Sequence, residues 1–186
     1  VKLLCIVLEN LFVDIPYNLR HKKNNKIENN QIMENINFVV SRGEASDIDS
    51  IVQFQADMAM ESEGYTLDKE KVTKGVSAAM LDESKGIYWV AKIEGRTIGS
   101  LMLTREWSDW NNEWYWWIQS VYVVPEYRKH GIYKAMYSTL KEVAKENNVS
   151  QIRLYVDKAN HPAQQVYQRL GMHESHYLMF EENLND

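Results

Sequence analysis

Apolar and polar positions recur with clear periods from residue 36 onward, and these periods predict an ordered series of strands and helices. Alternation of period two indicates strands, and apolar residues three or four apart indicate helices. In chain order we expect a strand at 37–42, helices opening near Ser46 and Asp68, strands at 87–93, 97–107 and 114–124, a helix at 130–147, a strand at 151–157, a short helix opening at Asn160, and two short strands within 173–181.

Residues that typically begin or end helices and strands support these boundaries. Pro125 stops the longest strand, because proline cannot donate a hydrogen bond to a strand ladder. Asn160 is a suitable helix cap, and Pro162 suits the first turn that follows it. Gly171 stands where a helix ends, at a position that favours positive φ.

The element order indicates one α/β (α+β) domain, with a mixed, mainly antiparallel sheet and flanking helices, over residues 36–186. Residues 1–35 differ, because a polar, Asn-rich stretch cannot bury much surface. We interpret this stretch as a flexible N-terminal extension. The alternative is an added strand or helix that serves in oligomerisation.

Composition narrows the classes of function. The chain has 186 residues, 45% of them hydrophobic and 25% charged, as in ordinary globular proteins. A net charge of −5 argues against a nucleic-acid binder. It is compatible with a cationic substrate, although acidity that merely aids solubility is the simpler interpretation.

A single cysteine, Cys5, allows no intrachain disulfide and favours a reducing, cytoplasmic setting. No apolar run reaches the roughly 20 residues that a membrane span needs, so we expect no membrane association. The apolar residues 3–8 faintly suggest a signal peptide, but Glu9 and Asn10 interrupt them, which makes secretion the less favoured expectation.

A basic, glycine-containing turn lies between the strand that ends at Pro125 and the next helix. Helix N-termini present free N–H groups and a partial positive charge, and Arg128 and Lys129 add full charges beside them. Gly131 would let a phosphate approach the backbone closely. The turn therefore predicts an anion site, and a merely solvated basic turn is an equal alternative. Neither a P-loop nor a dinucleotide-binding fingerprint is present.

Two motifs carry a resemblance to a known family. Residues 128–133 are similar to the pattern [QR]-x-x-G-x-[GA], except that Tyr133 replaces the small residue. Residues 160–172 are similar to N-x-x-A-x-x-x-Y-x-x-x-G-[FM]. Together, in this order, the motifs resemble the GNAT superfamily of N-acetyltransferases, and the resemblance runs from about residue 36 to the end.

The resemblance implies a GNAT-like fold that uses acetyl-CoA as the acetyl donor, without a metal. It implies that Val121, Tyr122 and Val123 pair with the pantetheine arm through their backbone. It also implies that backbone N–H groups of the loop bind the phosphates. The remaining cofactor-site residues that it implies are Arg128, Lys129, His130, Gly131, Ile132, Tyr133, Asn160 and Tyr167.

The resemblance further implies that Tyr167 is the general acid that protonates the departing thiolate. A phenol with a pKa of about 10 is protonated at neutral pH and can serve in this way. The alternative is a tyrosine that only anchors its helix in the core.

The general base is less defined, because Gln119 stands where many family members carry a glutamate. An amide cannot usefully accept a proton, so the base lies elsewhere or water relays the proton. Four carboxylates from loops that should rim the acceptor side are candidates, although for each one an ordinary surface carboxylate is the favoured interpretation. These candidates are Glu61, Glu63, Glu106 and Asp109.

A tryptophan-rich hairpin surrounds the turn at 109–112. Alternation directs Trp114 and Trp116 to one face of the strand and Tyr115 and Trp117 to the other. Core packing or a homodimer surface is the favoured interpretation. In the alternative, Trp107 or Trp110 makes a cation–π contact with the acceptor amine.

His173 and His176 would point to opposite faces of a strand, so we expect no metal site there. The function that we expect is acetyl-CoA-dependent acetylation of a primary amine on an unidentified acceptor. Two alternatives stay open: a non-catalytic acyl-CoA-binding module, and an acyltransferase that uses another acyl-CoA or a hydroxyl acceptor.

Overall fold

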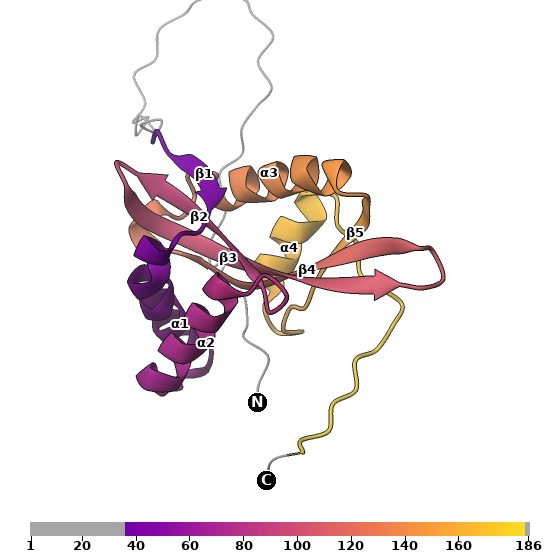
Figure 1. The fold of residues 1–186 in the computed structure, drawn as a ribbon, viewed down its shortest axis with the longest axis horizontal. Coiled ribbons are helices and arrows are strands. Elements are labelled where there is room, and N and C mark those ends of the chain that lie inside the picture. The colour runs from indigo at the N-terminus through magenta and orange to yellow at the C-terminus, as the bar shows by residue number, and fades with distance from the viewer. Residues whose placement is uncertain (1–35, 185–186) are drawn as a thin grey trace, which may run out of the picture.

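Within residues 36–184, five strands form one sheet, and their order across the sheet follows their order along the chain (Figure 1). The computed structural model describes residues 36–184. The first, second, third and fourth strands pair with one another in antiparallel fashion, whereas the fifth runs parallel to the fourth. The strands are β1 (Val39–Arg42), β2 (Ile87–Ile93), β3 (Arg96–Ser108), β4 (Glu113–Val123) and β5 (Val149–Leu154).

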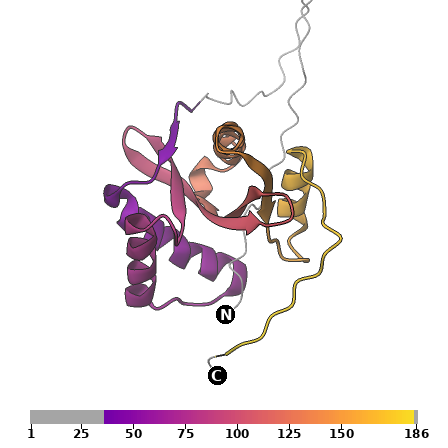
Figure 2. The ribbon, with the colours of Figure 1, turned by 45° about the vertical axis from the view of Figure 1, so that its right-hand side comes forward.

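In the described part of the chain, four α-helices cover the two faces of this sheet, so the predicted mixed, mainly antiparallel architecture is confirmed. Figure 2 shows the first two helices on one side of the sheet and the last two on the other. The helices are α1 (Ile48–Glu63), α2 (Lys69–Leu81), α3 (Ile132–Glu146) and α4 (His161–Arg169). The predicted N-terminal extension, residues 1–35, lies outside the described residues.

Strand alternation divides the core between the two faces. On β2, Trp89 and Ala91 lie in the larger cluster, which α3 and α4 cover. Tyr88 and Val90 lie in a smaller cluster against α1 and α2. The sheet is therefore apolar on both faces at this position, and each face has its own pair of helices.

Local signals explain most helix ends. The Asp68 side chain caps α2 by accepting hydrogen bonds from two backbone N–H groups, as predicted. Asn160 caps α4 by accepting from the Ala163 N–H. Gly171 has φ +90°, the conformation predicted for it. The prediction for Ser46 is wrong, because Glu44 and Asp47 form a capping box around a 3₁₀ turn that precedes α1.

Asp47 ties the start of α1 to the sheet. It is buried, and its oxygens accept hydrogen bonds from the Thr97 hydroxyl at 2.6 Å and the Glu44 N–H at 2.8 Å. Its carboxylate also lies 2.9 Å from the Lys92 ammonium group. Burial alone would raise the pKa of Asp47, but these partners together hold it below the ordinary value.

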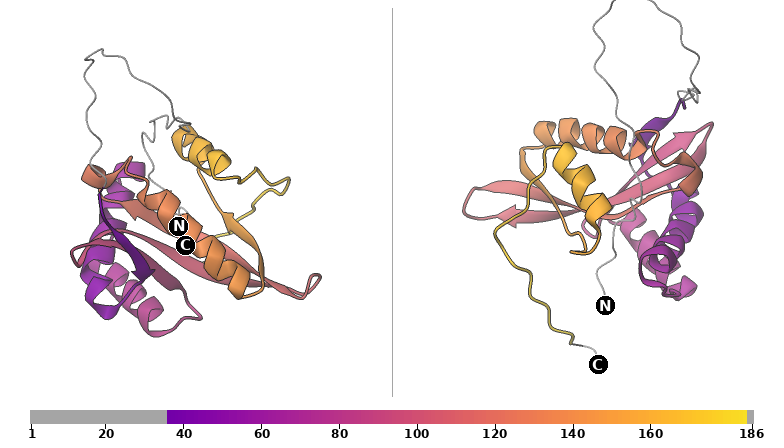
Figure 3. Two further views of the ribbon diagram at one scale, coloured as in Figure 1. Left: turned by 90° about the horizontal axis from the view of Figure 1, so that it is seen from above. Right: turned by 180° about the vertical axis from the view of Figure 1, so that it is seen from behind.

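The two strands predicted within residues 173–181 are absent, and that prediction is wrong. The segment after α4 is extended but pairs with no strand among the described residues, and it runs away from the sheet (Figure 3). Its apolar side chains, including Tyr177 and Phe180, are largely exposed. The apolar run at residues 177–180 packs into none of the core clusters of the described residues, so nothing holds it in place as a strand.

Candidate functional site

The two halves of β4 have different neighbours. Residues 114–118 pair with β3 on one side and with β5 on the other. The ladder with β5 ends where Ile118 meets Leu154, which is the last residue of β5. Among the described residues, 119–123 pair with β3 alone. We call 114–118 the closed half and 119–123 the open half of β4.

A β-bulge separates these halves. Leu101 of β3 faces two residues of β4, Ser120 and Val121, because the register shifts between Ser100 and Met102. Ser120 has φ +52°, in the left-handed region that a serine seldom adopts. Bulges bend the strand that carries the extra residue. The bend in β4 therefore occurs where its pairing with β5 ends.

Beyond the bulge, alternation turns some backbone groups away from β3. The Val124 N–H donates to the Ile98 carbonyl at 2.9 Å, and the Tyr122 carbonyl lies close to Gly99 of β3. The N–H and C=O groups of Val121 and Val123 must therefore face the side that β5 leaves unpaired. Among the three predicted pantetheine partners, these two valines present their backbone to the open edge.

The loop after the open half ends at a helix N-terminus. A 3₁₀ turn, Pro125–Tyr127, leads into residues 128–131, where Lys129 has φ +69° and Gly131 has φ +77°. The Gly131 carbonyl accepts from the Ala135 N–H at 2.9 Å, so the N–H groups before Ala135 have no partner within the helix. The first turn of α3 carries no acidic residue. These features suit an anion.

The Arg128 side chain does not extend from the loop toward the α3 N-terminus. Its Nε donates to the Val123 carbonyl at 2.8 Å, and its Nη2 donates to Glu61 Oε2 at 2.7 Å. The guanidinium carbon lies 5.3 Å from the centre of the Tyr122 ring. The positive charge of Arg128 is thus held against the open half of β4, whereas Lys129 is exposed on the loop.

Tyr133, the residue that departs from the family motif, points into the core. It is 3% exposed, and its hydroxyl has no hydrogen-bond partner within residues 36–184. Its ring packs against Tyr137 and, edge to face, against Tyr167 at a centroid distance of 6.0 Å. Burial raises the pKa of Tyr133. The bulky ring therefore leaves the surface of the loop uncovered.

Tyr167, the predicted general acid, is buried on α4. It belongs to the same core cluster as the side chains of Val121 and Val123. The Asn160 cap fixes the start of α4, two turns before Tyr167. The fold thus brings α4 to the face of the sheet that lies under the open half of β4.

The four predicted base candidates occupy different places. Glu61 contacts the open half, because its Oε1 accepts from the Tyr122 hydroxyl at 2.6 Å while its Oε2 pairs with Arg128. Glu106 contacts the closed half through Trp117, which donates to it, and Arg153 of β5 donates to it as well. Glu63 ends α1, and Asp109 is exposed in the β3–β4 turn.

Gln119 is the first residue of the open half, and its side-chain amide donates to the Thr104 hydroxyl at 2.7 Å. Of the four base candidates, only Glu61 lies against this half of the strand. Sequence reasoning missed the side-chain partners of Glu61, Tyr122 and Arg128. No local pattern joins residues that lie more than 60 positions apart.

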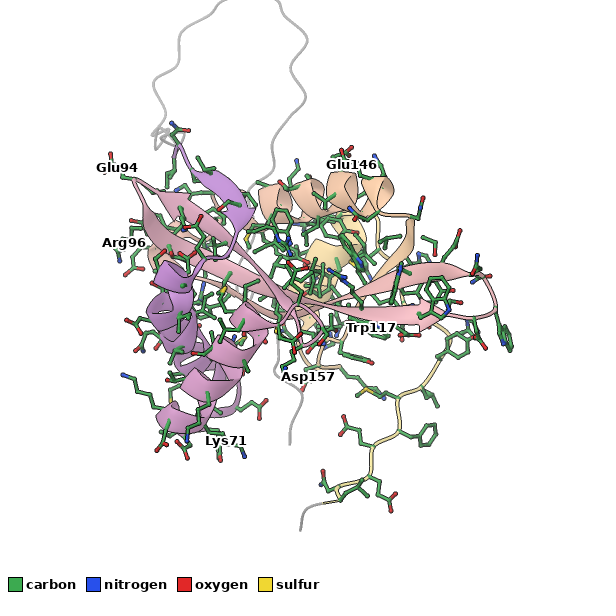
Figure 4. All side chains as sticks on the ribbon, in the orientation of Figure 1. Lys71, Glu94, Arg96, Trp117, Glu146 and Asp157 are labelled. Atoms are coloured by element: carbon green, nitrogen blue, oxygen red, sulfur yellow. The ribbon has the colours of Figure 1, made fainter. Side chains whose placement is uncertain are left out.

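The aromatic hairpin follows the predicted alternation. Trp116 lies in the core beneath α3, whereas Trp117, labelled in Figure 4, stacks on Tyr155 on the other face. Trp107 and Trp114 pack edge to face toward the hairpin end. Trp110 is 93% exposed in the turn. A homodimer that buries this end stays a prediction.

Residues 53–172 match the family model described as the acetyltransferase (GNAT) family, which is well over half of the chain. The chain belongs to the GNAT family of acetyltransferases. The two motifs found in the sequence lie within this match, and the mixed, mainly antiparallel sheet with flanking helices is the GNAT-like fold that the resemblance implied.

Relatives of this GNAT protein agree with the assignment. An uncharacterized N-acetyltransferase from Archaeoglobus fulgidus is 25% identical over 129 residues, which are 69% of this chain and 88% of the relative. A possible acetyltransferase from Clostridium difficile 630 is 39% identical, with a TM-score of 0.76, over 80% of this chain and 99% of that one.

A more distant structure shows the fold alone. It is described as a predicted acetyltransferase from Clostridium acetobutylicum, solved with acetyl-CoA. It is 21% identical to this GNAT chain, with a TM-score of 0.63, over 79% of this chain and 96% of that one. The family assignment makes the protein an acyltransferase.

Between residues 36 and 184, no group of three or more His, Cys, Asp and Glu side chains could hold a metal ion. His173 and His176 both lie in the extended segment after α4. In the same part of the chain, no helix is long and apolar enough to cross a membrane.

Proposed function

We propose that this protein transfers an acetyl group from acetyl-CoA to a primary amine by direct attack of the amine on the thioester. The observation that carries the proposal is the open half of β4, which runs into the N-terminus of α3. An extended, amide-containing arm that ends in a pyrophosphate suits this arrangement. Acetyl-CoA has both parts.

The residues present fit this donor. The backbone groups of Val121 and Val123 can pair with the amides of the arm, as one strand pairs with another. The free N–H groups of residues 129–133 can bind the phosphates. A Cβ atom built on Gly131 would meet no atom within 4 Å, so the surface above the loop has space for a ligand.

In the reaction, the amine nitrogen forms a bond to the carbonyl carbon, and the carbon–sulfur bond breaks. Backbone N–H groups at the open edge stabilise the negative charge that develops on the carbonyl oxygen. Tyr167 donates its phenolic proton to the departing sulfur. Its place in the same core cluster as the side chains of Val121 and Val123 supports this role.

The amine must also lose a proton, and we assign Glu61 as the acceptor of that proton. Its carboxylate lies against Tyr122 in the open half of β4. Glu106 is tied to the closed half by Trp117 and Arg153, and Asp109 lies in the exposed turn of the hairpin. If Glu61 is not the base, water relays the proton.

Calorimetry with acetyl-CoA tests the donor site first, because it needs no knowledge of the acceptor. We expect saturable binding with one site per chain. A panel of polyamines, amino acids and peptide N-termini would then be screened for release of CoA. No binding at millimolar acetyl-CoA would overturn the proposal.

A second candidate is a non-catalytic acyl-CoA-binding module. Gln119 supports it, since its amide is engaged with Thr104 and offers no proton acceptor. Donor binding without CoA release across the whole panel would favour this candidate. Repeating the screen with propionyl-CoA, succinyl-CoA and hydroxyl acceptors would separate it from an acyltransferase of different specificity.

A further inference from the structure

Arg128 occupies a backbone group that the donor needs under the proposed function. Its Nε donates to the Val123 carbonyl at 2.8 Å, on the edge of β4 that β5 leaves unpaired. A pantetheine amide that adds to this edge as a strand would donate to the same carbonyl. A carbonyl oxygen can accept two hydrogen bonds, so the competition is for space: the guanidinium lies along the same unpaired edge that the arm would follow as an added strand.

Three contacts from two elements hold Arg128 in this position. Besides the carbonyl, Nη2 pairs with Glu61 Oε2 at 2.7 Å, and the guanidinium lies over the Tyr122 ring. The Arg128 side chain is only 15% exposed, so solvent weakens the pairing less than at an open surface. Hydrogen bonds between charged groups are stronger than neutral ones.

The same contacts reach the proposed base. Glu61 Oε2 is occupied by Arg128, while Oε1 accepts from the Tyr122 hydroxyl at 2.6 Å. Both oxygens of the carboxylate are thus engaged while Arg128 remains on the strand edge. Movement of the guanidinium would leave Oε2 able to accept a proton or a hydrogen bond from an amine.

We propose that Arg128 competes with the pantetheine arm for the strand edge at the Val123 carbonyl and thereby couples donor binding to the availability of Glu61. The donor enters first, displaces the guanidinium from the strand edge and leaves Glu61 ready for the acceptor. The inference rests on the proposed function. It differs from the motif-based expectation, in which Arg128 strengthens donor binding.

The two roles of Arg128 predict opposite changes in the affinity for the donor arm when Arg128 is replaced. Arg128→Met removes the donors and the charge but keeps an apolar stem over Tyr122. The probe is S-acetylpantetheine, which has the arm without the pyrophosphate of CoA. Only molecules whose strand edge is free can bind the probe, so the apparent affinity of the wild type is the intrinsic affinity multiplied by that fraction. We therefore expect the variant to bind this probe about threefold to tenfold more tightly than the wild type.

Lys129→Met is the matched control, because Lys129 is the neighbouring basic residue and is exposed on the loop. It should leave the affinity for S-acetylpantetheine unchanged and weaken binding of acetyl-CoA, which carries the phosphates. Calorimetry of both ligands with each variant, after a melting curve has verified folding, makes the comparison. Equal or weaker binding of S-acetylpantetheine by folded Arg128→Met would overturn the inference.

Glu61→Gln keeps the test decisive if Arg128→Met does not fold. The amide removes the ionic partner of Arg128, so the guanidinium should leave the edge more often and S-acetylpantetheine should bind about twofold more tightly. Unchanged or weaker binding would again overturn the inference. If the wild type binds neither ligand, the proposed function itself fails; if it binds both and only these variants disagree, the competition alone fails.

Discussion

The closed and open halves of β4 show how one strand serves two purposes. Residues 114–118 exchange hydrogen bonds with strands on both sides, whereas residues 119–123 have a neighbour on one side only. Paired backbone groups hold the sheet together, and unpaired ones remain able to bind a ligand. The difference teaches that unpaired backbone groups of the strand, and not side chains alone, form the candidate site.

The open half differs from an ordinary edge strand because it lies inside the sheet order, beside the end of β5. An unpaired edge is a template for unwanted strand addition. Here the edge is only a few residues long, a bulge bends it, and Arg128 covers one of its carbonyls. These features limit pairing with another chain while leaving the edge within reach of a small extended ligand.

The largest expected effect concerns chemistry at the open half. Tyr167→Phe removes the proton that the departing sulfur would take, so turnover should fall by roughly 10²- to 10⁴-fold. The affinity for acetyl-CoA should change far less, because the ring remains in the core. Steady-state rates of CoA release, with calorimetry as the control, measure the two effects. A normal rate would return Tyr167 to a purely packing role.

The closed half should instead govern stability. Ile118 is 1% exposed in the core, and Ile118→Ala should lower the free energy of unfolding by about 2–5 kcal/mol. Denaturant titration measures this loss. The affinity for acetyl-CoA per folded molecule should be nearly unchanged at low temperature. A large loss of affinity in the folded variant would contradict the separation of the two halves.

Two glutamates provide a matched pair, one against each half. Glu61→Gln should lower the rate of acetyl transfer by about 10²-fold, because a positioned base is lost. Glu106→Gln, against the closed half, should leave the rate nearly unchanged. Rates recorded against pH for both variants test this, and no effect from either would favour a water relay.

Substitutions at two glycines with similar backbone conformations distinguish the effect of backbone strain on stability from an effect on donor binding. Gly131→Val in the loop and Gly95→Val in the β2–β3 turn both place a side chain at positive φ, which should cost roughly 1–2 kcal/mol of stability each. Glu94 and Arg96, labelled in Figure 4, mark the Gly95 turn at the far end of the sheet from Trp117.

Only Gly131→Val should also weaken acetyl-CoA binding, by about tenfold, because the added side chain fills the space above the helix N-terminus. Calorimetry on the two variants gives the comparison directly. Equal affinities in both would remove the loop from the donor site.

The smallest expected effect is on the helix that carries Glu61. The pKa of Asp47 lies below its ordinary value in the folded protein, so its contribution to stability is present above the unfolded pKa of about 3.9 and is lost as the pH falls through the folded value. Stability measured by urea titration should therefore decline in this acidic window. Asp47→Asn should show a shallower decline there, and an identical decline would assign the acid sensitivity to other carboxylates.

The sequence predicted elements well where the signal was local. The strand boundaries are correct within a few residues, and the Asp68 and Asn160 caps and the positive φ of Gly171 are confirmed. The segment after α4 was predicted wrongly, since its apolar run satisfies a strand pattern without any partner to complete a ladder.

Orientation of the site residues was harder to predict. The motif placed Arg128 in the loop, but not the direction of its side chain, which depends on Glu61 of α1. The structure explains why Tyr133 can replace the small residue of the family motif, because its ring packs in the core against Tyr137 and Tyr167.

The sequence by itself determined the order of the elements as far as α4, the basic glycine turn and the two motifs that carry the family resemblance, because each resides in a short contiguous stretch. Tertiary structure alone decided where β5 stops pairing with β4, which carboxylate meets the open half, and that Arg128 lies on the Val123 carbonyl. These outcomes depend on contacts between distant segments, whose free energies are set only once the helices pack on the sheet.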